Sequence, residues 1–132
     1  MSDPVSSELQ QMKQQWLTQH IVNYAYTFEN GCFCSEEVTQ PVRIEVRNGV
    51  RASIRSVTGG QPVNEEYFAP YDTIPKLFDM IQAAIAKKPA QIVVRYDPKI
   101  GFPTDIFIDP DKSIADEETR LNVYGFEIIS KP

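Results

Sequence analysis

The sequence predicts an α+β fold, a mainly antiparallel sheet of about six strands with two helices on one face, in the order αβββαβββ. Two segments repeat apolar residues every three or four positions, which is typical of helices that lie on a core. The other regular segments alternate apolar and polar residues, as half-buried strands do. The links within each group of strands are short, and short links join antiparallel strands.

The first helix is predicted from Pro4 or Ser6 to Val22. Asp3 before Pro4 gives a favourable N-cap followed by a proline in the first helical position. One stripe of the helix faces the core, and it consists of Leu9, Met12, Trp16 and His20. The remaining positions are mostly polar, so the opposite face is expected to be wet.

A strand is predicted over Asn23–Phe28, and a hairpin over Pro41–Val57. A two-residue Asn-Gly turn would place apolar residues opposite polar ones, so we expect a three-residue loop over Arg47–Gly49. Gly49 would then take the left-handed conformation of a bulge. The expected partners are Val46 with Val50, Ile44 with Ala52, and Val42 with Ile54.

The segment Thr58–Tyr71 is predicted to be the longest loop, and its length suits a mobile flap. The second helix is predicted to begin at Asp72 or Thr73, with Pro75 in its first turn and Pro89 as its stop. Its apolar stripe is the clearest in the chain, and it consists of Ile74, Leu77, Phe78, Ile81 and Ile85.

A second hairpin is predicted from Ile92–Tyr96 through a five-residue turn, Asp97–Gly101, into a strand that ends near Asp109. The expected partners are Tyr96 with Phe102, Val94 with Thr104, and Ile92 with Ile106. The last strand, Arg120–Ile129, is apolar on both faces, so we expect it inside the sheet rather than at an edge.

Composition indicates one domain over residues 1–132, with residues 1–5 expected to be disordered. A formal net charge of −5 argues against nucleic-acid binding, which depends on Lys and Arg at the phosphates. No segment is long and apolar enough to cross a bilayer. The polar start is not a signal peptide. We therefore expect a cytoplasmic protein if the chain is complete, or a periplasmic or envelope protein if Met1 replaces an export segment.

Cys32 and Cys34 form the densest chemical feature of the chain. On a regular strand their side chains would point the same way and lie too far apart for a disulfide, so a bond between them requires a tight turn, which Gly31 allows. Two buried thiols, a structural disulfide, a redox dithiol and half of a metal site are all compatible with the spacing.

An acidic segment after the second hairpin begins like a calcium loop but lacks the required glycine and bidentate glutamate. A solvated loop is the simpler interpretation, and a weak metal site is the alternative, from Asp109, Asp111, Asp116 and Glu117. No nucleophile elbow, phosphate-binding glycine loop or zinc-protease motif occurs, so neither a catalytic residue nor a cofactor is predicted.

A binding surface is predicted where unusual turns carry aromatic residues, because loops held by rigid strands concentrate binding residues. It joins the cysteine segment to the second hairpin. Its members are Phe33, Tyr96, Asp97, Gly101, Phe102, Pro103 and Thr104, beside Cys32 and Cys34. The alternative is that each aromatic ring only fills the core.

Several motifs resemble the bacterial domain-of-unknown-function family 6174, from Trp16 onward. The most specific are Cys32-Phe33-Cys34 and the run Tyr96-Asp97-Pro98 through Gly101-Phe102-Pro103-Thr104. The resemblance implies a small protein of the exported or lipid-anchored kind. It implies no activity, because none is established for that family.

The function expected from these features is a non-enzymatic binding or interaction module of the cell envelope, whose partner is a protein or a small ligand. One alternative is a small thiol-redox protein that uses Cys32 and Cys34. Another is an inhibitor-like module of two tandem helix-plus-sheet units, suggested by the faint similarity of Pro41–Val46 to Pro103–Ile108.

Overall fold

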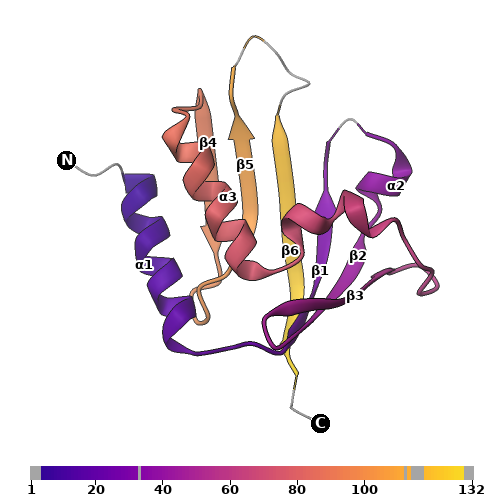
Figure 1. The fold of residues 1–132 in the computed structure, drawn as a ribbon. Coiled ribbons are helices and arrows are strands. Elements are labelled where there is room, and N and C mark those ends of the chain that lie inside the picture. The colour runs from indigo at the N-terminus through magenta and orange to yellow at the C-terminus, as the bar shows by residue number, and fades with distance from the viewer. Residues whose placement is uncertain (1–3, 33, 112, 114–117, 130–132) are drawn as a thin grey trace.

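The computed structural model describes residues 4–32, 34–111, 113 and 118–129. One antiparallel sheet holds six strands in the order β3-β2-β1-β6-β5-β4, which confirms the predicted fold class (Figure 1). The strands are β1 (Tyr24–Asn30), β2 (Val42–Arg47), β3 (Val50–Ser56), β4 (Gln91–Tyr96), β5 (Pro103–Asp109) and β6 (Thr119–Ile128). The helices are α1 (Pro4–Thr18), α2 (Glu36–Thr39) and α3 (Ile74–Ala86), with 3₁₀ turns over Glu65–Tyr67 and Ala69–Tyr71.

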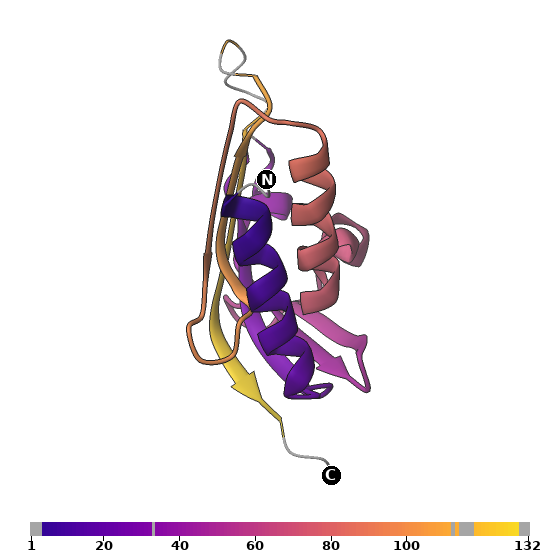
Figure 2. The same ribbon diagram turned by 90° about the vertical axis from the view of Figure 1, so that its left-hand side faces the viewer.

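The two long helices lie side by side on one face of the sheet, as predicted (Figure 2). Between the layers lies a core in which aromatic rings from the sheet meet the apolar helix stripes. The largest side chains that are almost fully buried there include Tyr24, Tyr26, Phe28, Phe68 and Phe78. The opposite face of the sheet carries no helix, so it is open to solvent or to a partner.

Helix α3 follows the sequence prediction closely. Thr73 is its N-cap, with a side chain that accepts a hydrogen bond from the Lys76 amide at 3.4 Å. Pro75 stands in the first turn, where its missing N–H leaves no bond unmade. The predicted apolar stripe is buried except for Ile85, which is partly buried.

Helix α1 ends at Thr18, four residues before the predicted end, and it already includes Pro4 and Val5. Its last turn is polar, and the Thr18 hydroxyl donates to the Gln15 carbonyl at 2.9 Å, a local bond that competes with further helical turns. His20 has a positive φ of 52° and is exposed, so it does not extend the core stripe as predicted.

The first hairpin corrects our predicted register. The turn has two residues, Asn48 and Gly49, both with positive φ, and Arg47 faces Val50. A β-bulge after this pair shifts the register, so that Ile44 faces Ile54 and not Ala52. The bulge returns the apolar side chains to one face, which removes the mismatch that made the two-residue turn look unfavourable.

The second hairpin is corrected for the same reason. Tyr96 faces Pro103, and a register shift beside it moves every later pair, so that Val94 faces Ile106 and Ile92 faces Ile108. A bulge adds a residue without changing which side chains face the core farther along the strand. The predicted faces were therefore right while the predicted partners were wrong.

Strand β6 lies between β1 and β5, which confirms the prediction that it is not an edge strand. The order β3-β2-β1-β6-β5-β4 also places two three-stranded units next to each other in the same internal order. The helices do not repeat this arrangement, because α1 packs against α3 and β4 rather than on its own unit. None of the described helices is long and apolar enough to span a membrane.

Two connecting segments contain more structure than a simple loop, and one of them is the predicted loop over residues 58–71. The short helix α2 follows the cysteines, and its carbonyl and amide groups close its own turn. Within residues 58–71, Phe68 is 1% exposed and contacts Phe28 edge to face, so this ring ties the segment to the core. The Tyr26 hydroxyl donates to the Tyr71 carbonyl at 2.6 Å and holds its end.

Candidate functional site

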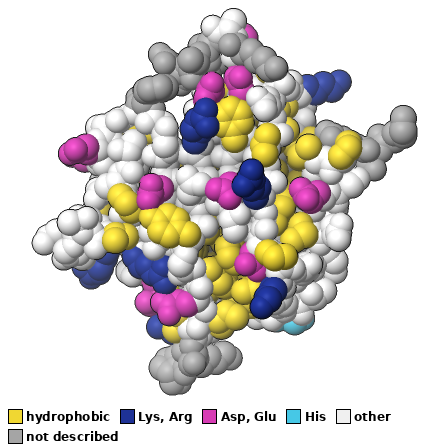
Figure 3. Space-filling model, turned by 180° about the vertical axis from the view of Figure 1, so that it is seen from behind, with side chains coloured by type: hydrophobic (Ala, Val, Ile, Leu, Met, Phe, Trp, Pro, Cys, Tyr) yellow, Lys and Arg dark blue, Asp and Glu magenta, His cyan; other side chains and the backbone are white. Residues whose placement is uncertain are grey.

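A cleft of about 670 Å³ lies on the open face of the sheet, where β5 and β6 separate. These two strands pair only from Asp105 with Asn122 to Ile108 with Thr119. Below that point β5 bends away into the turn of the second hairpin, while β6 continues beside β1. The cleft is thus the space between β5 and β6 where the two strands diverge. Figure 3 shows this face, on which hydrophobic side chains lie interspersed with acidic and basic ones.

The floor of the cleft is aromatic. Phe102 stacks on Phe126 with 4.4 Å between ring centroids, and Phe126 also meets the edge of Trp16 from α1. Phe102 is only 5% exposed. Stacked rings at this spacing are favourable beyond their buried area, so the floor is rigid and continuous with the core.

A bulge in β6 lies beside this floor. The register between β1 and β6 shifts beside Gly125, which has a positive φ of 62°. Arg43 fixes the bulge from β2, because its guanidinium donates to the Gly125 carbonyl at 2.7 Å and to the Thr27 hydroxyl at 3.1 Å. The same side chain forms an ion pair with Glu127.

The rim of the cleft carries carboxylates that come from different elements. One row of residues crosses the strands, and each of its members faces the next in register. The row consists of Glu29, Asn122, Asp105 and Arg95. The Asn122 amide donates to Asp105 at 2.6 Å, and the Thr104 hydroxyl donates to the other carboxylate oxygen at 3.1 Å.

Tyr124 donates its hydroxyl hydrogen to Glu29 at the far side of the cleft. This bond raises the pKa of the Tyr124 phenol, because ionisation would remove the donor and place a negative charge beside Glu29. Tyr124 is 47% exposed although it is a large aromatic residue. Its ring is therefore available to a ligand as a wall of the cleft.

Asp97 is the third carboxylate that lines the cleft, and it comes from the turn between β4 and β5. One of its oxygens accepts the amides of Lys99 at 3.1 Å and Ile100 at 2.7 Å. These bonds close the turn. Asp97 therefore has a structural role in addition to any role in binding.

None of the three carboxylates forms an ion pair within the part of the chain that the structure describes. Glu29 and Asp105 are held by neutral side-chain donors, and Asp97 by backbone amides. Arg95 faces Asp105 in register without bonding to it, because both Asp105 oxygens are turned toward other partners. None of the described Lys and Arg side chains therefore lies within ion-pair distance of these carboxylates, although Arg95 faces Asp105 from the neighbouring strand.

The structure separates the predicted binding residues into two groups. Asp97, Phe102 and Thr104 line the cleft. Tyr96 points to the helix layer, where it stacks on Phe78, and burial raises the pKa of its hydroxyl. Pro103 is buried, and Gly101 packs so closely on α1 that a Cβ there would lie 2.6 Å from the Met12 carbonyl oxygen.

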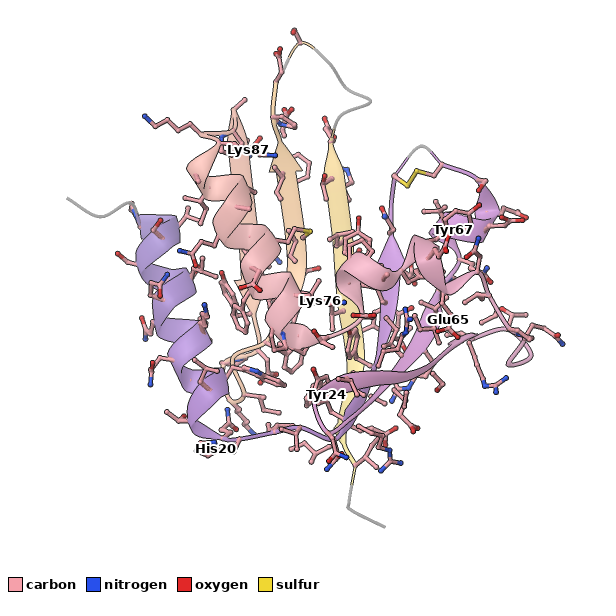
Figure 4. The ribbon with its side chains drawn as sticks, viewed as in Figure 1. His20, Tyr24, Glu65, Tyr67, Lys76 and Lys87 are labelled. Carbon is pink, nitrogen blue, oxygen red and sulfur yellow. A yellow bond between two sulfur atoms is a disulfide. The ribbon has the colours of Figure 1, made fainter. Side chains whose placement is uncertain are left out.

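The cysteine segment lies at the other end of the sheet. Gly31 bonds to the carbonyl of Arg120 at the start of β6, whereas the turn of the second hairpin accepts hydrogen bonds from Gln15 and Gln19 near the end of α1. Figure 4 shows this separation, with the disulfide at the upper right and His20 at the lower left. The cysteine segment and the cleft are therefore not one site.

Cys32 and Cys34 are joined in a disulfide, with 5.3 Å between their Cα atoms. The segment turns tightly instead of forming a strand, and the Asn30 side chain supports the turn by accepting the Cys32 amide at 3.1 Å. Of the interpretations compatible with the spacing, this arrangement corresponds to a disulfide. Phe33, the third predicted member, lies outside the described residues.

The acidic segment after β5 is described only in part, since Asp116 and Glu117 lie outside the described residues. Asp109 is buried, and one of its oxygens has no hydrogen-bond partner among the described residues. Asp111 is exposed, and the Ser113 amide and hydroxyl that bond to it lower the pKa of its carboxyl. No three metal-binding side chains come together among the described residues.

Sequence reasoning missed the half of the cleft that lies on β1 and β6, namely Glu29, Asn122 and Tyr124. Glu29 is separated from Tyr124 by 95 residues, and their contact depends on the pairing of β1 with β6. The sequence offered no signal for this half of the cleft, because single exposed aromatic residues are common on protein surfaces.

A second group of charges lies on the helix side and differs from the cleft. Asp72 is 4% exposed, and its two oxygens lie 2.7 Å from the Lys76 ammonium and 3.2 Å from the Arg51 guanidinium. Arg51 also pairs with Glu65 at 3.2 Å. The Asp72 cluster, defined as Asp72, Lys76, Arg51 and Glu65, ties β3 and the first 3₁₀ turn to the start of α3.

Comparison with known proteins gives one match. A model described as "Family of unknown function (DUF6174)" matches residues 8–128. No curated protein and no solved structure matches this chain.

Proposed function

We propose that this chain, which belongs to the DUF6174 family of unknown function, is a non-enzymatic binding module whose ligand site is the open-face cleft. The ligand carries a positive charge on an apolar stem. One observation carries the proposal: three carboxylates surround an aromatic floor, and no described Lys or Arg pairs with them.

Charge and shape support the same ligand. Unpaired carboxylates at a partly enclosed surface attract a cation more strongly than they would in bulk water. The stacked Phe102 and Phe126 rings offer an apolar surface to a methylene chain, and the exposed Tyr124 ring suits a cation–π contact. An alkylammonium or guanidinium group on a short chain meets both requirements.

The residues that line the cleft favour binding over catalysis. The described lining contains no His, Cys or Ser, so it lacks the Ser–His and Cys–His pairs that acyl-transfer hydrolases use. The only His of the chain, His20, is exposed at the end of α1.

The test is a titration of ¹⁵N-labelled protein with Nα-acetyl-lysine methylamide at low ionic strength. We expect amide shifts confined to β5, β6 and the turn between β4 and β5. The double variant Glu29→Gln with Asp105→Asn should lose at least tenfold in affinity. The matched control, Glu36→Gln with Glu37→Gln, removes the same charge from exposed residues of α2 and should bind as the parent does. Equal binding by both variants would overturn the proposal.

A thiol-exchange function is the second candidate, because Cys34 is exposed and its disulfide is therefore open to attack. In that exchange the thiolate of a reductant attacks one sulfur of the disulfide and forms a mixed disulfide. A second thiol of the reductant then attacks the mixed disulfide, which releases the protein as a dithiol and the reductant as a disulfide. Equilibration with glutathione tests it. A potential well above about −300 mV is expected of an exchanging disulfide, whereas a structural one lies below that value.

A further inference from the structure

The backbone of β6 has an unpaired edge along the cleft. Strand β6 continues to Ile128 with β1 on one side, but its pairing with β5 stops at Asn122. From Val123 onward, the β6 backbone groups that point toward β5 therefore have no strand beside them. Such an edge is a template for an extended chain.

The unpaired edge of β6 and the carboxylates belong to the same cleft. Val123, Tyr124, Gly125 and Phe126 line it from β6, and Asp105 and Thr104 line it from β5. An extended chain beside β6 would place alternate side chains toward the open face, about 6.6 Å apart, because strand residues alternate between faces. Glu29 and Asp105 flank Asn122 in the cross-strand row, so they stand about two strand spacings apart, roughly 9.6 Å.

We propose that the physiological ligand of the cleft is an extended basic segment of a partner protein, with Lys or Arg at alternate positions, bound along the free edge of β6. This inference rests on the proposed function and adds the class of partner. Charge complementarity selects the occupant, because the cleft offers carboxylates and neutral oxygens but no described cation within ion-pair distance of them. The apolar floor accepts the methylene stems, and main-chain bonds to β6 fix the direction of the segment.

Main-chain hydrogen bonds to β6 should increase the affinity of an extended peptide above that of a single lysine derivative. The probe is the peptide acetyl-Ala-Lys-Ala-Lys-Ala-amide, compared with Nα-acetyl-lysine methylamide at the same ionic strength. We expect the peptide to bind at least tenfold more tightly, since it adds backbone hydrogen bonds and a second charge. A norleucine peptide of the same length controls for apolar contact and should bind at least tenfold more weakly.

Two singly N-methylated peptides sharpen the test. Neighbouring amides of an extended chain point to opposite sides, so methylation at one of two adjacent residues should lower affinity about tenfold while methylation at the next is tolerated. On binding, amides of β6 between Val123 and Phe126 should also exchange more slowly with solvent.

The outcomes separate the two levels of the proposal. If both methylated peptides bind like the parent peptide and β6 gains no protection, the strand-like segment is overturned while the cation site stands. If Glu29→Gln with Asp105→Asn leaves peptide binding unchanged, the proposed function itself fails. Urea unfolding of that double variant confirms that it is folded before binding is measured.

Discussion

The Asp72 cluster and the open-face cleft both contain carboxylates, but the two regions differ in what holds them: cations in the cluster, and neutral hydrogen-bond donors in the cleft. Asp72 is buried between Lys76 and Arg51, so the protein neutralises it with its own cations. Glu29 and Asp105 are held by the neutral side chains of Tyr124, Asn122 and Thr104. Neutral donors fix the direction of a carboxylate without cancelling its charge.

The difference separates charge that supports the fold from charge that is available to a ligand. A buried carboxylate needs a cation because desolvation penalises the charged form. A carboxylate at the rim of a cleft stays partly hydrated and does not need one. A partly hydrated carboxylate without a cation remains available to a ligand, and the predictions below test that distinction.

The largest effect is expected at the Asp72 cluster. Asp72→Asn should destabilise the protein by about 2–3 kcal/mol, because it leaves two cations beside a buried neutral amide. The partial exposure of Arg51 and Lys76 keeps the effect below that of a fully buried pair. Urea unfolding at neutral pH measures it. Asp79→Asn, at an exposed position of the same helix, is the matched control and should change stability by less than about 0.5 kcal/mol.

The next effect is on stability at alkaline pH. Tyr24 accepts the Ile74 amide beside the Asp72 cluster, and burial raises the pKa of its phenol from 10.0 to about 12. The pKa of the Tyr24 phenol is therefore higher in the folded than in the unfolded protein. Its contribution to the free energy of unfolding is present in full below pH 10 and is lost as the pH rises toward 12. At pH 11 the loss from this group should be about 1.4 kcal/mol.

Unfolding midpoints measured from neutral pH to about pH 11 test this loss, and Tyr24→Phe should reduce the slope. Tyr124 provides the contrast, because its phenol is exposed and bonded to Glu29. The pKa of the Tyr124 phenol is also raised, but the ring is largely exposed, so Tyr124→Phe should reduce the slope by less than Tyr24→Phe does. An equal change in slope for both variants would contradict the distinction between the two regions.

At the cleft, loss of charge should alter binding and spare the fold. Asp105→Asn and Glu29→Gln should each shift the free energy of unfolding by less than about 0.5 kcal/mol, because both residues are only partly buried and neither is ion-paired. Each should weaken binding of the lysine peptide about three- to tenfold in calorimetry. A stability loss close to that of Asp72→Asn would assign these carboxylates to the fold.

The smallest effect is expected from Arg95, which faces Asp105 in register without bonding to it. Arg95→Gln should strengthen peptide binding about two- to threefold, because it removes a nearby positive charge that opposes the ligand. Arg55→Gln changes charge at an exposed position of β3, away from the cleft lining, and should have no such effect. A loss of affinity in Arg95→Gln would mean that Arg95 contributes to the site.

The two hairpins show why local patterns predicted faces better than partners. In each, the apolar alternation identified the strands, but one bulge moved the pairing. A bulge adds one residue to one strand, and its position depends on twist and on contacts across the sheet. The alternation of a single strand carries no information about those contacts.

The candidate site was predicted in part. Asp97, Phe102 and Thr104 line the cleft, whereas Gly101 and Tyr96 serve the packing of the hairpin on the helices. Turn chemistry identified the right segment, because Asp97 closes the turn through the Ile100 amide. It could not distinguish residues that face solvent from residues that face α1.

The sequence alone determined the helix α3, from Thr73 and Pro75 to its apolar stripe, and the number of strands and their order along the chain. These features depend on capping and periodicity, which act between residues a few positions apart. Only the tertiary structure decided that β6 would lie beside β1, that β5 would part from it, and that Glu29 would meet Tyr124. The cleft exists because three strands distant in sequence share one face, and that arrangement is fixed by burial of the whole core rather than by any local pattern.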